Sequence, residues 1–139
     1  MNYSRELGNF AEEKAAEYLL LNGYEILGRN FVNRLGELDI IASERTLSKP
    51  ELIIVEVRCR MIGEIQSPLE SVGTKKIKQL VRTARLLVEE SNWKYFWRID
   101  VIGITIKSKV TIQELQTQKN IKIELEHVKD ITSGMNIFN

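Results

Sequence analysis

GELDIIA at residues 36–42 and VEVRCR at residues 55–60 are two apolar stretches that carry charged side chains where a buried strand normally has none. Side chains alternate between the two faces of a strand, so each stretch brings two charged residues to one face. A buried carboxylate is costly unless it pairs with a cation or binds a metal ion. The pattern therefore predicts a charged site where two strands meet, held by ion pairs or by a cation. The residues concerned are Glu37 and Asp39 in the first stretch and Glu56 and Arg58 in the second.

The hydrophobic periodicity around these stretches predicts an α/β fold with the order helix, three strands, helix, strand. The links between the first three strands are short, which favours an antiparallel meander. The second helix then acts as a crossover, which makes the fourth strand parallel to the third and the sheet mixed. The expected helices span 5–21 and 74–90, and the expected strands span 24–29, 37–42, 52–58 and 98–106.

The size of the chain favours a single domain. A chain of 139 residues that is 43% hydrophobic and 28% charged can bury its own core, and we expect a single domain over 1–139. The core is predicted to cover residues from about 4 to 106. Residues 107–139 are expected to form peripheral strands and a frayed tail, because 109–115 and 120–128 show strand-like alternation.

The composition excludes several kinds of protein. The amino-terminal segment has no apolar stretch of the secretory type, and no stretch approaches the roughly 20 apolar residues of a membrane helix. Cys59 is the only cysteine and His127 the only histidine, so an internal disulfide and the common Cys/His zinc sites are excluded. We therefore expect a cytoplasmic protein without a membrane partner.

Positive charge gathers in one part of an otherwise balanced sequence. The net charge is +1, but residues 73–98 hold seven basic side chains against two acidic ones. Such a surplus attracts phosphate, although a charge run of this kind is also the ordinary solvated face of a helix. On the first interpretation, these side chains follow a nucleic-acid backbone. The residues expected to do so are Lys75, Lys76, Lys78 and Arg82.

An ordered set of motifs resembles the PD-(D/E)xK nuclease superfamily and, more closely, the YraN family of small bacterial proteins. The motifs are AEEKAAEYLLLNGYEILGRN (11–30), GELDIIA, VEVRCR, ESVGTKKIKQL (70–80) and RIDVI (98–102), and the matching region covers about two thirds of the chain. The resemblance implies a restriction-endonuclease-like αβββαβ core, in which helices flank a mixed central sheet. This core is similar to that of archaeal Holliday-junction resolvases.

The resemblance also implies a role for each charged position. Asp39 and Glu56 correspond to the metal-binding acids. Glu12 corresponds to an acid carried by the first helix, and Glu37 to an auxiliary acid. Arg58 occupies the position at which the family's motif is expected to have lysine. Mg²⁺, or Mn²⁺ in its place, is the expected cofactor, because Mg²⁺ prefers oxygen ligands and is held by one or two carboxylates with water and substrate phosphate.

These positions favour a metal-dependent nuclease that hydrolyses phosphodiester bonds in DNA, with branched or single-stranded DNA as candidate substrates. Arg58 keeps a second interpretation open, because arginine stays protonated and the same fold could bind nucleic acid without cutting it. A third is a protein-interaction scaffold that uses the aromatic run at 93–97, which also fits packing in the core or a homodimer interface. A structural alternative for Asp39, Glu56 and Arg58 is an ion-pair cluster that fixes strand register.

Overall fold

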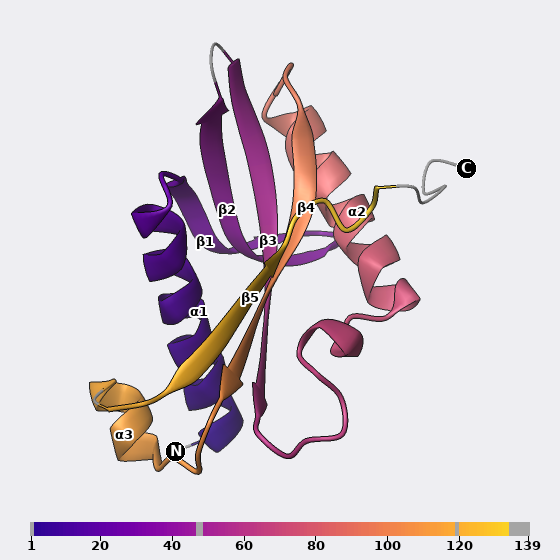
Figure 1. Cartoon of the computed structure of the whole chain (residues 1–139). Coiled ribbons are helices and arrows are strands. Elements are labelled where there is room, and N and C mark those ends of the chain that lie inside the picture. Colours follow the sequence, from indigo (N-terminus) through magenta and orange to yellow (C-terminus); the bar gives the residue numbers. More distant parts are fainter. Residues whose placement is uncertain (1, 47–48, 119, 134–139) are drawn as a thin grey trace.

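The computed structural model of the chain describes residues 2–46, 49–118 and 120–133. Within them, a five-stranded sheet carries helices on both faces (Figure 1). The elements, in chain order, are α1 (Tyr3–Leu21), β1 (Glu25–Asn33), β2 (Gly36–Thr46), β3 (Lys49–Met61), the 3₁₀ helix η1 (Leu69–Ser71), α2 (Thr74–Glu90), β4 (Trp97–Ile106), α3 (Ile112–Thr117) and β5 (Ile123–Val128).

The strands lie in the sheet in the same order as in the sequence. β1 pairs antiparallel with β2, and β2 pairs antiparallel with β3. β3 and β4 run parallel, joined by α2 as the crossover, and β5 returns antiparallel to β4. The mixed sheet flanked by helices confirms the predicted α/β class, and the elements from α1 to β4 follow the αβββαβ order expected from the sequence.

One long helix covers each face of the sheet. α1 packs Ala15 and Leu19, both fully buried, against Ile53 of β3. α2 packs Leu80 against the opposite face, next to Ile54 of the same strand. Burying a side chain of this size contributes about 1.5–3 kcal/mol. Because β3 is buried on both faces, its central residues are continuously apolar rather than alternating with polar ones.

The ends of the helices follow local signals in the sequence. The side chain of Asn2 accepts hydrogen bonds from the backbone N–H groups of Ser4 (3.0 Å) and Arg5 (3.4 Å), so α1 begins before the expected start. It is followed by Gly23, whose φ of 86° is the left-handed conformation that stops a helix. α2 has the predicted bounds, 74–90. No described helix combines the length and apolar character needed to cross a membrane.

The predicted strand at 109–115 is wrong, because this segment leads into helix α3. Thr111 and Glu114 form a capping box: each side chain accepts a hydrogen bond from the other's backbone N–H, at 3.1 and 3.0 Å. This signature outweighs the apolar alternation that suggested a strand. Leu115 of α3 is 2% exposed and lies in one cluster with Phe10, so the short helix covers one end of the core.

The segment after α3 is attached to the sheet. β5 lies within the predicted strand at 120–128. Beyond it, the backbone N–H of Asp130 donates to Asp100 Oδ1 (2.9 Å), and that of Ile131 donates to a β4 carbonyl (2.8 Å). These two residues of the expected tail are thus bonded to β4, and its last part, 134–139, lies outside the described residues.

The turn between β1 and β2 packs directly on α2. Asn33 Nδ2 donates to the backbone carbonyl of Thr83 (3.1 Å). Gly36 lies so close to the helix that a Cβ there would be 2.7 Å from Thr83 Oγ1 and would overlap the side chain of Gln79. Glycine permits this approach, which sets the position of β2 and hence of Asp39.

We expect Gly36→Ala to lower the free energy of unfolding by about 1–3 kcal/mol, because the added methyl group must displace the side chains of both Thr83 and Gln79. Gly8 is the matched control, since it is exposed on α1 with open space where its Cβ would be. Gly8→Ala should raise the free energy of unfolding by about 0.5–1 kcal/mol. Urea denaturation followed by circular dichroism measures both variants, and effects of the same sign would contradict the close approach at Gly36.

Candidate functional site

The side chains of β2 do not alternate regularly between the two faces of the sheet around Asp39. Leu38 belongs to the apolar cluster beneath α2, Ile40 to the cluster beneath α1, and Ile41 again to the α2 cluster. Leu38 and Ile41 are three positions apart yet point to the same face, so the regular alternation breaks between them. The β2–β3 ladder reaches as far as Ile40, which lies opposite Val55. Asp39 thus lies where the two strands separate.

The Asp39 carboxylate takes the place of a ladder bond at this point. Its Oδ2 accepts a hydrogen bond from the backbone N–H of Val57, at 2.8 Å. The side chain satisfies the β3 donor without bringing the β2 backbone into register with it. The carboxylate is thereby held beside Glu56, the residue that precedes Val57.

Glu56 is a buried and strongly perturbed carboxyl group. It is 4% exposed, and its Oε2 lies 3.0 Å from Arg58 Nη2 and 3.8 Å from Lys76 Nζ. Burial raises the pKa of Glu56 to about 7, helped by the charge of Asp39 and a hydrogen bond with it, while the two cations oppose the increase. Near neutral pH, Glu56 therefore holds a proton part of the time unless another cation joins the site.

Glu12 approaches Asp39 from α1. Burial, followed by the charge of Asp39, raises the pKa of Glu12. Glu37 adds to this increase and Arg29 opposes it. The Oε1 atom of Glu12 is buried without a hydrogen-bond partner among the described residues. A buried carboxylate oxygen in this condition is unfavourable, so the arrangement is stabilised when a cation or an ordered water contacts it.

A cavity of about 370 Å³ opens beside Glu12, between α1, β1 and α3. Glu13 and Arg29 line it and form an ion pair across it, at 3.0 Å. The described lining does not include Asp39 or Glu56. The cavity therefore gives room for water or substrate next to Glu12.

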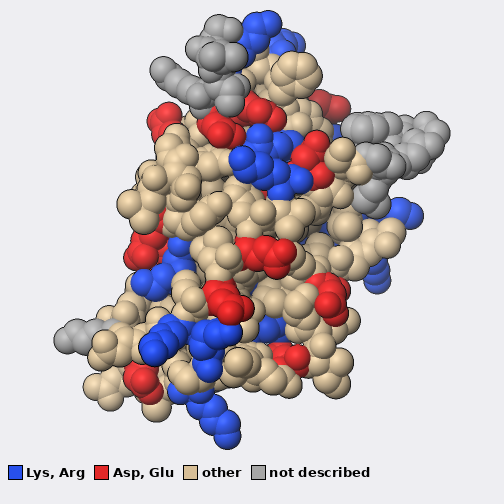
Figure 2. All heavy atoms as spheres, in the orientation of Figure 1, with Lys and Arg blue, Asp and Glu red and all other residues tan. Residues whose placement is uncertain are grey.

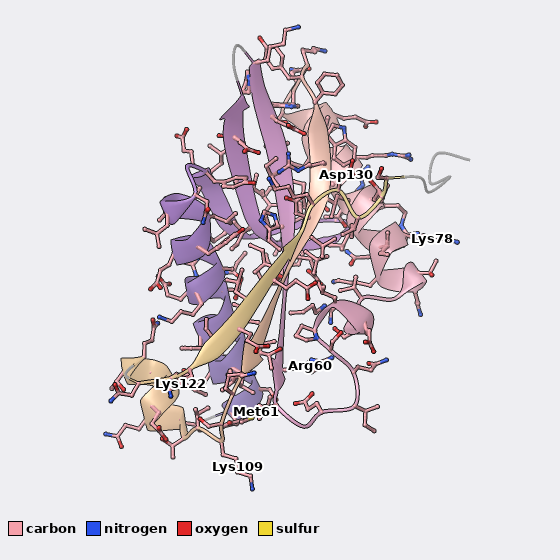
Figure 3. All side chains as sticks on the ribbon, in the orientation of Figure 1. Arg60, Met61, Lys78, Lys109, Lys122 and Asp130 are labelled. Carbon is pink, nitrogen blue, oxygen red and sulfur yellow. The ribbon has the colours of Figure 1, made fainter. Side chains whose placement is uncertain are left out.

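The structure gathers part of the predicted site and leaves part of it apart. The predicted catalytic acids and Arg58 come together at the opening between β2 and β3. Glu37, the predicted auxiliary acid, is exposed and acts on Glu12 through its charge. Figure 3 shows Lys78 projecting from α2 away from the sheet. The exposed members of the predicted nucleic-acid surface are Lys75, Lys78 and Arg82.

Positive charge is not continuous over the face drawn in Figure 2. On the face drawn in Figure 2, basic and acidic side chains are interspersed, in keeping with the net charge of +1. The basic side chains of α2 therefore stand out as a local feature rather than as part of one large basic surface.

Lys76 is the one member of the predicted nucleic-acid surface that contacts the acids within the described residues. Its ammonium lies 3.8 Å from Glu56 Oε2, whereas the sequence interpretation groups it with its exposed neighbours. The signal for its different orientation is its spacing from Leu80, because residues four apart share one face of a helix. Leu80 is fully buried against the sheet, which brings Lys76 to the inner side of α2.

Asp39 and Glu56 are the residues suited to hold a divalent cation. Among the described residues, no three His, Cys, Asp or Glu side chains are gathered closely enough to form a metal site by themselves. Two carboxylates are nevertheless a usual protein contribution to a Mg²⁺ site, which water and phosphate complete. A cation beside Asp39 would lower the pKa of Glu56, because it would offset the negative charge that raises this pKa. The donor set therefore fits Mg²⁺ or Mn²⁺.

A second charged group, which we call the distal cluster, consists of Arg98, Asp100 and His127 on the α1 face of β4 and β5. Asp100 is fully buried. Its Oδ1 accepts a hydrogen bond from Arg98 Nε at 2.9 Å, and its Oδ2 is hydrogen-bonded to His127 Nε2 at 2.7 Å. Burial alone would raise the pKa of Asp100, but hydrogen bonds from His127 and Arg98 lower it. Arg98 also pairs with Glu44 and Glu51, each at 3.2 Å. Such complete pairing is typical of a structural network.

We expect Asp100→Asn to lower the free energy of unfolding by about 3 kcal/mol, because the buried network loses the charge that bonds both Arg98 and His127, although Arg98 keeps its pairs with two glutamates. Urea denaturation measures this loss. Any stabilisation of the protein by Mn²⁺ should be the same in this variant as in wild type, since the distal cluster is separate from Asp39 and Glu56. A stability within about 0.5 kcal/mol of wild type, the range of an ordinary surface substitution, would contradict the structural role.

The aromatic run at 93–97 is divided between core and surface. Trp93 and Trp97 pack in the cluster beneath α2, and Trp93 Nε1 donates to the backbone carbonyl of Phe96 (3.0 Å). Tyr95 and Phe96 are 51% and 77% exposed. Packing accounts for the two tryptophans, and an interface over the exposed pair stays a prediction.

The part of the chain that is similar to known proteins contains the whole site. The model of the "Uncharacterised protein family UPF0102" matches residues 11–104, a range that includes every residue of the site from Glu12 to Lys76. The chain belongs to this family. UPF0102, also known as YraN, lies in the PD-(D/E)xK nuclease-like superfamily that the sequence motifs resemble.

Individual UPF0102 proteins show how far the similarity extends. One from Caldicellulosiruptor saccharolyticus is 38% identical over 117 residues, which cover 84% of this chain and 96% of the relative. One from Chlorobium chlorochromatii is 33% identical over 129 residues, covering 93% of this chain and 92% of the relative. One from Syntrophomonas wolfei is 39% identical over 112 residues, covering 77% of this chain and 93% of the relative. The similarity spans most of each relative, so the predicted family is confirmed.

We expect the metal-free protein to lose stability as the pH rises from about 4.5 to about 7. The folded state keeps a proton on Glu56 in this window and the unfolded state does not, so the free energy of unfolding falls, by on the order of 2–3 kcal/mol for Glu56. Asp39→Asn removes a charge that raises this pKa but keeps an acceptor for the Val57 N–H. It should therefore be more stable than wild type by about 1 kcal/mol at pH 8 and nearly equal to it at pH 5.

Urea denaturation in the presence of a chelator, at pH 5 and pH 8, measures this difference. A destabilisation of Asp39→Asn that is the same at both pH values would mean that the hydrogen bond to Val57, and not the charge, accounts for the effect.

Proposed function

We propose that this protein is a metal-dependent nuclease that hydrolyses phosphodiester bonds in DNA, with branched and single-stranded DNA as the substrates to test. The observation that carries the proposal is the contact between Asp39 and Glu56 at the opening between β2 and β3, with two cations on Glu56. Two adjacent carboxylates, of which Glu56 has a raised pKa and is flanked by two cations, suit a site for a metal ion and a phosphate.

The proposed cofactor is Mg²⁺ or Mn²⁺, held by Asp39 and Glu56. When bound, such an ion lowers the pKa of an attacking water and screens the charge of the phosphate. The hydrogen bond from the Val57 N–H holds the Asp39 carboxylate, and the ion pair with Arg58 holds that of Glu56. Both carboxylates are therefore oriented without a bound ion. Glu12 would offer a further carboxylate acceptor at this site, because its Oε1 is buried without a partner among the described residues.

Arg58 contributes electrostatically in this proposal. Arginine stays protonated in proteins, so Arg58 cannot remove a proton from water. Its guanidinium lies 3.0 Å from Glu56 Oε2, where it orients that carboxylate and adds positive charge near the phosphate. Replacement of the expected lysine by arginine therefore leaves the electrostatic part of the role in place.

The exposed basic side chains of α2 are proposed to contact the DNA backbone beside the site. Lys75, Lys78 and Arg82 are exposed on the helix that also brings Lys76 to Glu56. Contacts of this kind position the substrate without reading its sequence, and they weaken as salt releases counterions.

Purified wild type and Asp39→Asn are incubated with end-labelled single-stranded, flapped and four-way DNA, in Mn²⁺ or Mg²⁺ and in a chelator. We expect metal-dependent products from wild type and a rate lower by on the order of 100-fold or more in Asp39→Asn, because one metal ligand loses its charge. Asp100→Asn, in the distal cluster, is the control for changes in stability. Products from Asp39→Asn at the wild-type rate would contradict the assignment of the site.

Thermal denaturation with increasing Mn²⁺ tests the metal site without any need for activity. We expect the ion to raise the melting temperature of wild type, because it binds the folded protein, and to leave Asp39→Asn unchanged. Salt-sensitive DNA binding without product at any metal concentration would overturn the nuclease proposal, and a wild type insensitive to Mn²⁺ would overturn the metal site.

A further inference from the structure

Two cations from different parts of the chain meet at one oxygen of Glu56. Arg58 comes from the same strand and lies 3.0 Å from Oε2, and Lys76 comes from α2 and lies 3.8 Å from it. The side chain of Glu56 is 5% exposed, whereas that of Arg58 is 25% exposed and that of Lys76 is 35% exposed. A single negative charge thus has two positive partners, one more than pairing requires.

Arg58 is committed to Glu56. The separation of 3.0 Å is that of a charge-assisted hydrogen bond. Its Nε is buried and has no hydrogen-bond partner among the described residues. Moving the guanidinium toward a substrate would break the short contact, so its main effect is on the orientation of Glu56.

Lys76 is held more loosely. A separation of 3.8 Å is within ion-pair range but too long for a hydrogen bond. Within the part of the chain that the structure describes, the ammonium therefore keeps its N–H donors for another acceptor. The side chain is also the more exposed of the two cations. An anionic oxygen that enters beside Glu56 can therefore bind Lys76 without displacing an existing hydrogen bond.

The position of Lys76 in α2 is unfavourable for the helix itself. α2 begins at Thr74 after Gly73, which provides no side-chain cap, and the first turn contains Lys75 and Lys76 but no acid. Positive charge at a helix amino terminus opposes the helix dipole by about 0.3–1 kcal/mol per charge. Local rules of this kind are broken most often at functional sites. A phosphate at this point would meet both the ammonium and the free N–H groups of the helix start.

We infer that Lys76 is a catalytic residue, whose ammonium contacts a non-bridging oxygen of the scissile phosphate beside Glu56. The inference rests on the proposed nuclease function and deepens it. In the reaction, a water oxygen bonds to phosphorus and one P–O ester bond breaks. The water proton passes to solvent, and the leaving oxygen takes a proton from solvent. Lys76 keeps its protons throughout and stabilises the charge that grows on the phosphate oxygens.

The test compares Lys76→Met with Lys78→Met, which removes the same charge from the same helix. Lys78 is the matched control because it is exposed and projects away from the sheet (Figure 3). kcat and KM are measured with Mn²⁺ on the DNA that wild type cleaves. We expect Lys76→Met to lower kcat by about 100-fold or more, and Lys78→Met to change kcat by less than about threefold while raising KM and reducing its salt dependence.

Two further measurements separate a catalytic role from a structural one. Lys76→Arg keeps the charge and should recover about tenfold or more of the lost kcat. Lys76→Met should keep the Mn²⁺-induced rise in melting temperature, which shows that the acids still form their site. Equal kcat values for Lys76→Met and Lys78→Met, or loss of the Mn²⁺ effect in Lys76→Met, would overturn the inference and leave the proposed function standing. A wild type that gives no product would overturn both.

Discussion

The hydrogen bond from the Val57 backbone N–H to the Asp39 carboxylate is the interaction on which the rest of the site depends. It satisfies a donor of β3 just beyond the β2–β3 ladder, so the two strands can separate without leaving that group unpaired. The separation brings Asp39 next to Glu56 and lets Glu12 approach from the α1 side. A β2 strand that continued in register would fill this space with ladder bonds, and the acids would be held apart on ordinary strand faces.

The two charged clusters of the sheet differ in how completely their polar atoms are paired. In the distal cluster, hydrogen bonds from His127 and Arg98 overcome the effect of burial and lower the pKa of Asp100. At the site, burial and the neighbouring Asp39 raise the pKa of Glu56 in spite of its two cations. The first arrangement is complete as it stands and stabilises the fold. The second keeps unfavourable proximity between acids, which a bound cation would relieve.

The parts of the fold with a strong local pattern could be predicted from the sequence, and the contacts between distant parts could not. α2 has its predicted bounds because apolar residues recur at helical spacing over 74–90. α3 is missed because a capping box starts a six-residue helix whatever the alternation around it. Alternation correctly places Glu56 and Arg58 together, but the break at Asp39 depends on Val57, which is 18 residues away on another strand. No pattern within β2 contains that information.

Arg58 and Lys76 show how this division between local and distant contacts affects the chemistry. Residues two apart on a strand share a face, so Arg58 meets Glu56 through the geometry of β3 alone. Lys76 reaches the same carboxylate because α2 packs Leu80 onto the sheet, so its place is set by the crossover helix. In the Glu-x-Arg motif of β3, the arginine is already paired with the glutamate of the same motif. A cation that is freer to contact the proposed phosphate therefore has to come from outside the strand. The first turn of α2 supplies one, which makes the packing of that helix, as much as the strand motif, a determinant of the site.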